Sequence, residues 1–196
     1  MRTNISTAVA LVLFSALMLA SDAFADSAAL IAVPNQTTVS SGGSFSVNVN
    51  ISNVADLYDY QLDLTFNPNV VSAIGVTEGV FLQSGGSTFF VPGTIDNTAG
   101  SITFNADTLL SAISGVTGGG VLLVFDFTAL SPGTSTFTIE NEILQDSTGA
   151  VLSDATTSGL VIVQGSTSVP EPSALLLLSV GALGLIGLAL KQSKAK

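Results

Sequence analysis

The side chains that could carry chemistry in the middle of this chain are carboxylates and hydroxyls. Cysteine, histidine and tryptophan do not occur in its 196 residues, and no lysine or arginine lies between Arg2 and Lys191. This composition excludes a Ser-His-Asp triad, a Cys-His pair and a zinc site built on histidine or cysteine. A pair of carboxylates remains, and such a pair can hydrolyse a glycosidic bond when the two acids lie about 5 to 10 Å apart.

An enzyme is nonetheless the least favoured of three hypotheses. Sites that cleave sugars usually hold the sugar against aromatic rings, whereas Tyr58 and Tyr60 fall on the same side of their segment as Leu62 and Leu64. That side is expected to face a core, and most phenylalanines occupy similar positions. We therefore predict that the protein is not an enzyme, and keep glycoside processing as the weakest hypothesis.

The charge of the central segment limits its partners. Residues 26–168 hold twelve acidic side chains and no base, a net charge of about −12. Such a surface cannot neutralise phosphate or sulfate, so we expect no nucleic-acid or anionic-polysaccharide partner, whereas divalent cations and basic proteins are suitable ones. The alternative is that the acids only keep an exported protein soluble. The acids are Asp26, Asp56, Asp59, Asp63, Glu78, Asp96, Asp107, Asp126, Glu140, Glu142, Asp146 and Asp154.

Calcium is one cation that this segment could bind, although the sequence leaves the identity of any metal unknown. Asp56 and Asp59, or Glu140 and Glu142, are spaced so that both members of a pair can offer oxygens to a hard cation. Such pairs are also common in acidic loops that bind nothing. We therefore expect no required cofactor and keep calcium as an alternative.

The segments that must position these side chains alternate between apolar and polar residues, which is typical of half-buried antiparallel strands. Asn67-Pro68 and Pro132-Gly133 are turn sequences between them. We predict an all-β, two-sheet jelly-roll sandwich of about nine strands, with a short helical turn at 108–114. Within 102–105 the alternation places Phe104 inside and Asn105 outside. The alternating segments are 45–52, 58–66, 102–105, 121–128, 136–140 and 161–163.

The N-terminal end has the three parts of a secretory signal peptide. Arg2 precedes an apolar run over 8–20, and Ala23 and Ala25 flank Phe24 as a small-x-small cleavage site. We predict cleavage after Ala25, so that the mature chain begins at Asp26. An uncleaved N-terminal anchor is the alternative.

The C-terminal end combines a short polar motif, an apolar segment and a basic tail. Residues 174–190 are 17 residues without a charge, which make about 25 Å of helix at 1.5 Å per residue. This length is short but adequate for a bilayer core, and the lysines at 191, 194 and 196 should stay in the cytoplasm. We predict a transmembrane helix over 174–190, with a buried helix of a globular domain as the alternative.

The polar motif in front of this helix is Val169, Pro170, Glu171, Pro172 and Ser173. Together with the helix and the basic tail, it resembles the PEP-CTERM sorting signal of exopolysaccharide-producing Gram-negative bacteria. The resemblance covers residues 169–196. It implies that exosortase, a membrane protease-transpeptidase, recognises the tail and releases or transfers the protein at the cell surface. The tail departs from the family pattern because lysine stands where arginine is usual.

The order of strands over about 30–163 resembles the cohesin module, a jelly-roll sandwich related to carbohydrate-binding modules. Segment 43–54 is similar to that family's second strand, 57–68 to its third, and 119–135 to a late strand with its turn. The resemblance implies a module that holds dockerin-bearing proteins. Dockerins carry calcium in EF-hand-like loops, and no such loop occurs in this sequence, so a dockerin would belong to another chain.

Cohesins meet their partners through a polar strand face, and this chain has a candidate for that face. The face consists of Asp59, Gln61, Asp63 and Thr65, which project to one side of segment 57–68. The alternative is a solvated sheet face that binds nothing.

These observations predict three segments, namely a signal peptide over 1–25, a cohesin-like sandwich over 26–168 and a sorting signal over 169–196. The expected function is that of a non-catalytic adhesion or scaffold module that is exported and anchored in the membrane by its C-terminal helix. Exosortase then sorts it to the cell surface or extracellular matrix. A carbohydrate-binding module on extracellular polysaccharide is the alternative.

Overall fold

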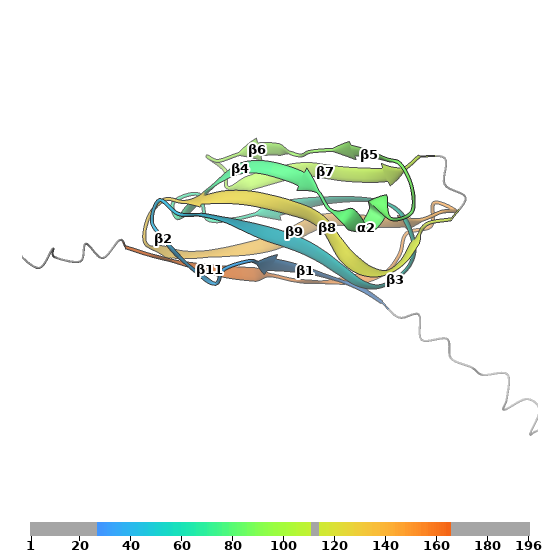
Figure 1. The fold of residues 1–196 in the computed structure, drawn as a ribbon, viewed down its shortest axis with the longest axis horizontal. Coiled ribbons are helices and arrows are strands. Elements are labelled where there is room, and N and C mark those ends of the chain that lie inside the picture. The colour runs from blue at the N-terminus through green and yellow to red at the C-terminus, as the bar shows by residue number, and fades with distance from the viewer. Residues whose placement is uncertain (1–26, 111–113, 166–196) are drawn as a thin grey trace, which may run out of the picture. The chain divides into compact units, whose positions relative to one another are not determined.

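The computed structural model describes residues 27–110 and 114–165, which form an all-β sandwich with one short helix, α2 (Val80–Gln83) (Figure 1). The described residues form eleven strands instead of the expected nine or so, because the short strands β2, β6 and β10 are paired as well. The strands are β1 (Ala28–Pro34), β2 (Thr38–Ser40), β3 (Ser44–Thr65), β4 (Val71–Glu78), β5 (Thr88–Val91), β6 (Thr94–Asp96), β7 (Ser101–Leu109), β8 (Val116–Ala129), β9 (Gly133–Asp146), β10 (Asp154–Thr157) and β11 (Gly159–Gln164).

The strands pack as two layers with the core between them. One layer has the order β10-β1-β3-β8-β4. The other has the order β2-β11-β9-β3-β7, with β5 and β6 both paired to β7. Figure 1 shows β5, β6 and β7 at the top of the view and β1 and β11 at the bottom.

Strand β3 belongs to both layers. Its first half pairs with β1 and β8, and its second half pairs with β7 and β9. Between the halves, Asn53 and Asp56 have positive φ angles of 55° and 60°, a conformation that Asn and Asp tolerate better than most residues. At the same point the buried positions change from every second residue to Val54 and Leu57. The strand is therefore redirected from one layer to the other within its own length.

An aromatic cluster fills the core. The ring of Phe127 in β8 lies 4.9 Å from that of Phe137, 5.2 Å from that of Phe66 and 5.6 Å from that of Phe45, measured between centroids. All four side chains are buried. The inward positions predicted for Phe45, Phe66, Phe127 and Phe137 are therefore confirmed.

The predicted alternation is wrong at two places. In β8, Leu122 and Leu123 are both buried beside a register shift. In β7, two neighbouring residues are reversed. Phe104 faces outwards and Asn105 is fully buried, the reverse of the expected arrangement. The cause is a β-bulge, in which residues 103 and 104 of β7 both lie opposite the single residue Asp63 of β3. A bulge inserts one extra residue into a strand and so shifts the alternation beyond it.

The buried side chain of Asn105 is fully hydrogen-bonded. Its Nδ2 donates to the carbonyl oxygens of Leu62 and Ile102, each at 3.1 Å, and its Oδ1 accepts from the backbone N–H of Gly93 at 3.0 Å. A buried amide is tolerated when it finds such partners. Asn105 can therefore take the inward place that the alternation assigned to Phe104.

The helical turn expected at 108–114 is not found in the described part of that segment, and the other expected helical segments lie outside the described residues. Thr108 and Leu109 continue β7 instead of beginning a helical turn, and 111–113 are outside the described residues. No helix in the described ranges is long and apolar enough to cross a membrane. The predicted signal peptide over 1–25, with Ala23 and Ala25, and the predicted motif and helix over 169–190 also lie outside the described residues.

Candidate protein-binding face

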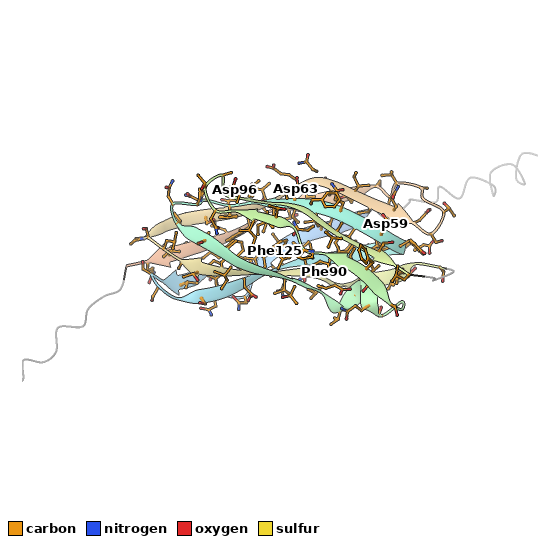
Figure 2. The ribbon with its side chains drawn as sticks, turned by 90° about the horizontal axis from the view of Figure 1, so that it is seen from above. Asp59, Asp63, Phe90, Asp96 and Phe125 are labelled. Atoms are coloured by element: carbon orange, nitrogen blue, oxygen red, sulfur yellow. The ribbon has the colours of Figure 1, made fainter. Side chains whose placement is uncertain are left out.

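The second layer has an outward face formed by β5, β7, the second half of β3, and β9; it is called the candidate face below. The four residues predicted from the sequence, Asp59, Gln61, Asp63 and Thr65, lie on it, because they alternate with the buried residues of β3. Figure 2 labels Asp59 and Asp63 at one edge of the view and Phe125 in the interior. The role of the four residues in binding remains a prediction.

Three apolar side chains on the candidate face are exposed. Phe89 of β5, Phe104 of β7 and Ile143 of β9 are 60%, 55% and 45% exposed. Together with Asp59 and Gln61 they line a hollow of about 490 Å³. This arrangement places an apolar patch beside the polar residues of β3.

Sequence reasoning did not find these three residues. Phe104 was assigned to the core, and Phe89 and Ile143 lie outside the alternating segments. The sequence Thr-Phe-Phe-Val of β5 could have revealed Phe89, because adjacent residues of a strand point to opposite faces. Phe90 packs against the core and leaves Phe89 outside.

Asp63 connects three strands of the candidate face. Its Oδ1 accepts a hydrogen bond from the backbone N–H of Phe104 in β7 at 2.7 Å. Its Oδ2 accepts a hydrogen bond from the side-chain amide of Asn141 in β9 at 2.8 Å. Asn141 is at a second register shift, in the pairing of β3 with β9. One carboxylate therefore holds an irregularity in each of its two neighbouring strands.

The charged groups of the candidate face are acidic. Burial raises the pKa of Asp59, and Glu140 accepts a hydrogen bond from the hydroxyl of Thr65 at 3.5 Å. No lysine or arginine in the sequence between Arg2 and Lys191 can offset these acids. An apolar patch with an acidic surround is complementary to a partner that carries basic side chains.

Asp56, one of the acids considered for calcium, is occupied by groups of the protein. Its Oδ1 accepts from the N–H of Gly115, and its Oδ2 accepts from the hydroxyl and the N–H of Ser147 at 2.6 and 3.3 Å. These bonds, the Ser147 hydroxyl first, lower the pKa of Asp56. The carboxylate therefore joins two loops to β3.

The acids Glu140 and Glu142 have different neighbours. Glu140 contacts Thr65, whereas the pKa of Asp154 is raised by burial and then by the charge of Glu142. Within the part of the chain that the structure describes, no three acidic, histidine or cysteine side chains are grouped so that they could hold a metal ion. The geometry gives no support to a calcium site at either pair.

Comparison with known families decides what this sandwich is. Residues 31–168 match the family model of the cohesin domain. The chain belongs to the cohesin family. The match covers more than half of the chain and confirms the resemblance seen in its strands. A search of curated proteins finds no match to this cohesin.

Solved cohesins share the fold of this cohesin domain. A non-cellulosomal cohesin from the archaeon Archaeoglobus fulgidus has a TM-score of 0.58 and 19% identity, covering 76% of this chain and 99% of its own. A type II cohesin from the cellulosome of Acetivibrio cellulolyticus has a TM-score of 0.60 and 20% identity, and the match covers 69% of this chain and 95% of its own. A type I cohesin of Clostridium thermocellum, solved in complex with a dockerin, has a TM-score of 0.58 and 14% identity, and the match covers 70% of this chain and 99% of its own. The TM-scores show a common fold, and at sequence identities this low the similarity is limited to the fold.

The C-terminal end of this cohesin chain has a match of its own. Residues 168–192 match the model of the PEP-CTERM protein-sorting motif, which confirms the second resemblance. The matched range includes Val169 to Ser173 and the apolar segment 174–190.

The cohesin domain also buries one acid behind β7, next to the partly exposed Glu78 of β4. Asp107 is 2% exposed, and neither of its carboxylate oxygens has a hydrogen-bond partner within the described residues. Burial, followed by the neighbouring Glu78 carboxyl, raises the pKa of Asp107 to about 7. Glu78 accepts a hydrogen bond from the hydroxyl of Thr88 at 2.5 Å. Because Asp107 is shielded from solvent, this pair gives no support to glycoside processing.

Proposed function

We propose that this cohesin is a non-catalytic adhesion or scaffold module, which binds a dockerin-like domain of another protein through the candidate face. The observation that supports this most strongly is the exposure of Phe89, Phe104 and Ile143 around one hollow. Large apolar side chains gathered on an exposed face are typical of protein interfaces, where aromatic residues supply much of the binding energy.

The charge of the face specifies the kind of partner. Asp59 lines the same hollow as the apolar residues, Glu140 lies on the same face, and the domain has no base of its own to pair with them. A partner with an apolar contact surface and lysine or arginine at its edge would complement both features. Its association should slow as salt is raised, because salt screens exposed charges.

A panel of recombinant dockerin modules, loaded with calcium, tests this proposal. We expect the domain to bind at least one module, and Gln61→Arg to weaken that binding by about tenfold or more, because it places a positive charge opposite a basic partner. Ile74→Arg is the matched control, since Ile74 is 59% exposed on β4 in the other layer. Equal losses for both variants, or no binding to any module, would contradict the proposal.

Binding of extracellular polysaccharide is the second candidate, because the exposed rings of Phe89 and Phe104 offer flat apolar surfaces. The ring of Tyr60, considered from the sequence, is buried, and its hydroxyl donates to the carbonyl oxygen of Leu122 at 2.9 Å. Retention of the domain on a neutral glucan resin, lost in Phe104→Ala, together with no binding to dockerin modules, would favour this candidate.

We also propose that the chain is exported, anchored through residues 174–190 and sorted to the cell surface by exosortase. The match to the sorting motif and the N-terminal pattern that ends at Ala25 support this proposal. The three segments would then be 1–25, 26–168 and 169–196.

The mass of the mature protein tests this processing. We expect a chain that begins at Asp26 and ends between Pro170 and Ser173. Trypsin has no site between Arg2 and Lys191, so the intact chain should be weighed. The control variant Pro170→Ala, or a host without exosortase, should leave the C-terminus at Lys196. A mature wild-type protein that ends mainly at Lys196 would show that the tail is not removed.

A further inference from the structure

Phe104 has a backbone conformation that phenylalanine rarely adopts. Its φ angle is +61°, in the left-handed region that is unfavourable for bulky side chains. Core packing does not account for this conformation, because the ring is 55% exposed. Strained residues that persist in folded proteins are held by their surroundings and gather at functional sites.

The surroundings that hold Phe104 are centred on Asp63. Its carboxylate accepts the N–H of Phe104 on one side and the side-chain amide of Asn141 on the other. Asn141 is also left-handed, with a φ angle of +52°. Hydrogen bonds to a charged acceptor are stronger than those between neutral groups. Both irregular neighbours of β3 therefore depend on one side chain.

The bulge decides which side chain of β7 reaches the partner. With regular pairing, Phe104 would point into the core and Asn105 would point outwards. The bulge reverses the two and brings the ring of Phe104 to the hollow that Phe89 and Ile143 also line.

We propose that Phe104 is the main anchor of the candidate face and that Asp63 is the positioning residue that fixes the Phe104 bulge. This inference rests on the proposed function and assigns separate roles within the same face. The partner is then a protein with an apolar pocket for one aromatic ring and basic side chains at the pocket edge, which face Asp59 of β3 and Glu140 of β9, since both carboxylate oxygens of Asp63 already accept hydrogen bonds.

Two variants that lack the ring test the strain without a partner. In strand interiors glycine is normally less stable than alanine. At position 104 we expect the opposite order, with a higher unfolding midpoint for Phe104→Gly than for Phe104→Ala, because glycine accepts a positive φ angle. We also expect Asp63→Ala to speed hydrogen exchange of the Phe104 amide by about tenfold or more, since its acceptor is lost. The normal order of midpoints, or unchanged exchange, would overturn the positioning role.

The dockerin modules that bind the unmodified domain test the anchor. We expect Phe104→Ala to weaken binding about 30-fold, as for a central aromatic residue of an interface. Asp63→Ala should weaken it about tenfold, and Asp63→Asn should restore most of the loss, because its carbonyl oxygen can still accept from Phe104. The double variant Asp63→Ala/Phe104→Ala should bind no more weakly than Phe104→Ala alone, because Asp63 acts through Phe104. Ile74→Ala is the control and should bind normally.

Each result separates the two roles. Additive losses in the double variant would mean that Asp63 contacts the partner directly, which overturns the positioning role. Normal binding by Phe104→Ala would overturn the anchor and leave the proposed function intact. If no module binds the unmodified domain, the proposed function fails and the anchor fails with it, while the midpoints and the amide exchange still decide whether Asp63 holds the bulge.

Discussion

Phe127→Ala is expected to lower the free energy of unfolding by about 4 kcal/mol, within the roughly 3–5 kcal/mol typical of such truncations in a core. Phe127 is fully buried and contacts the rings of Phe45, Phe66 and Phe137. Alanine would leave a cavity between rings from both layers that cannot easily close. Urea unfolding followed by circular dichroism measures the loss.

The control for this prediction is the same substitution at an exposed ring. Phe89→Ala removes a side chain that is 60% exposed, so it should cost less than about 1 kcal/mol. Phe127→Leu keeps most of the volume and should cost about 1.5 kcal/mol, which provides a folded variant if the alanine variant does not fold. Similar losses at positions 89 and 127 would contradict the central place given to the aromatic cluster.

The second large effect is a fall in stability as pH rises through the neutral range. In the unfolded chain the pKa of Asp107 is near 3.8, and in the folded domain it is raised to about 7. Between these values the folded state holds one more proton than the unfolded state. The free energy of unfolding should therefore fall by at most about 1.4 kcal/mol per pH unit from pH 4 to pH 7. Asp107→Asn should remove most of this slope, leaving the part due to Asp59 and Asp154, whose pKa values burial also raises, and should be more stable than wild type at pH 8.

Urea unfolding at several pH values between 4.5 and 8 measures this slope. Asp56→Asn is the control, because the pKa of Asp56 is lowered and its carboxylate stays charged in both states above pH 5. It should lower stability evenly across the range and leave the slope unchanged. If Asp107→Asn keeps the wild-type slope, the dependence arises from the general repulsion of the acids and not from the buried Asp107.

The fold of this domain is largely visible in its sequence. Segments 45–52 and 58–66 alternate strictly, and the structure buries the apolar members of each except Tyr58, which is partly buried against the core. Alternation suffices there because regular strands have a period of two and one face is in the core. The same alternation predicts β9 and β11, and their inward residues Phe137 and Val161 are buried.

The candidate face was visible only in part. Its polar half follows from the alternation of β3, whereas two of its three apolar residues, Phe104 and Ile143, reach the face through bulges at Phe104 and Asn141. Both bulges are stabilised by Asp63, which lies 41 and 78 residues away in the chain. A local pattern carries no information about such distant contacts. The burial of Asp107 was missed for the same reason, since alternation within 102–105 gave the wrong phase for the residues that follow.

Strand β3 imposes a constraint on how the domain can be divided. Any cut of the polypeptide that separates the two layers must also sever β3, because its halves belong to different layers. Neither layer can therefore exist as a fragment with all of its own strands. A force applied at the candidate face would be transmitted along the continuous backbone of β3 into the opposite layer.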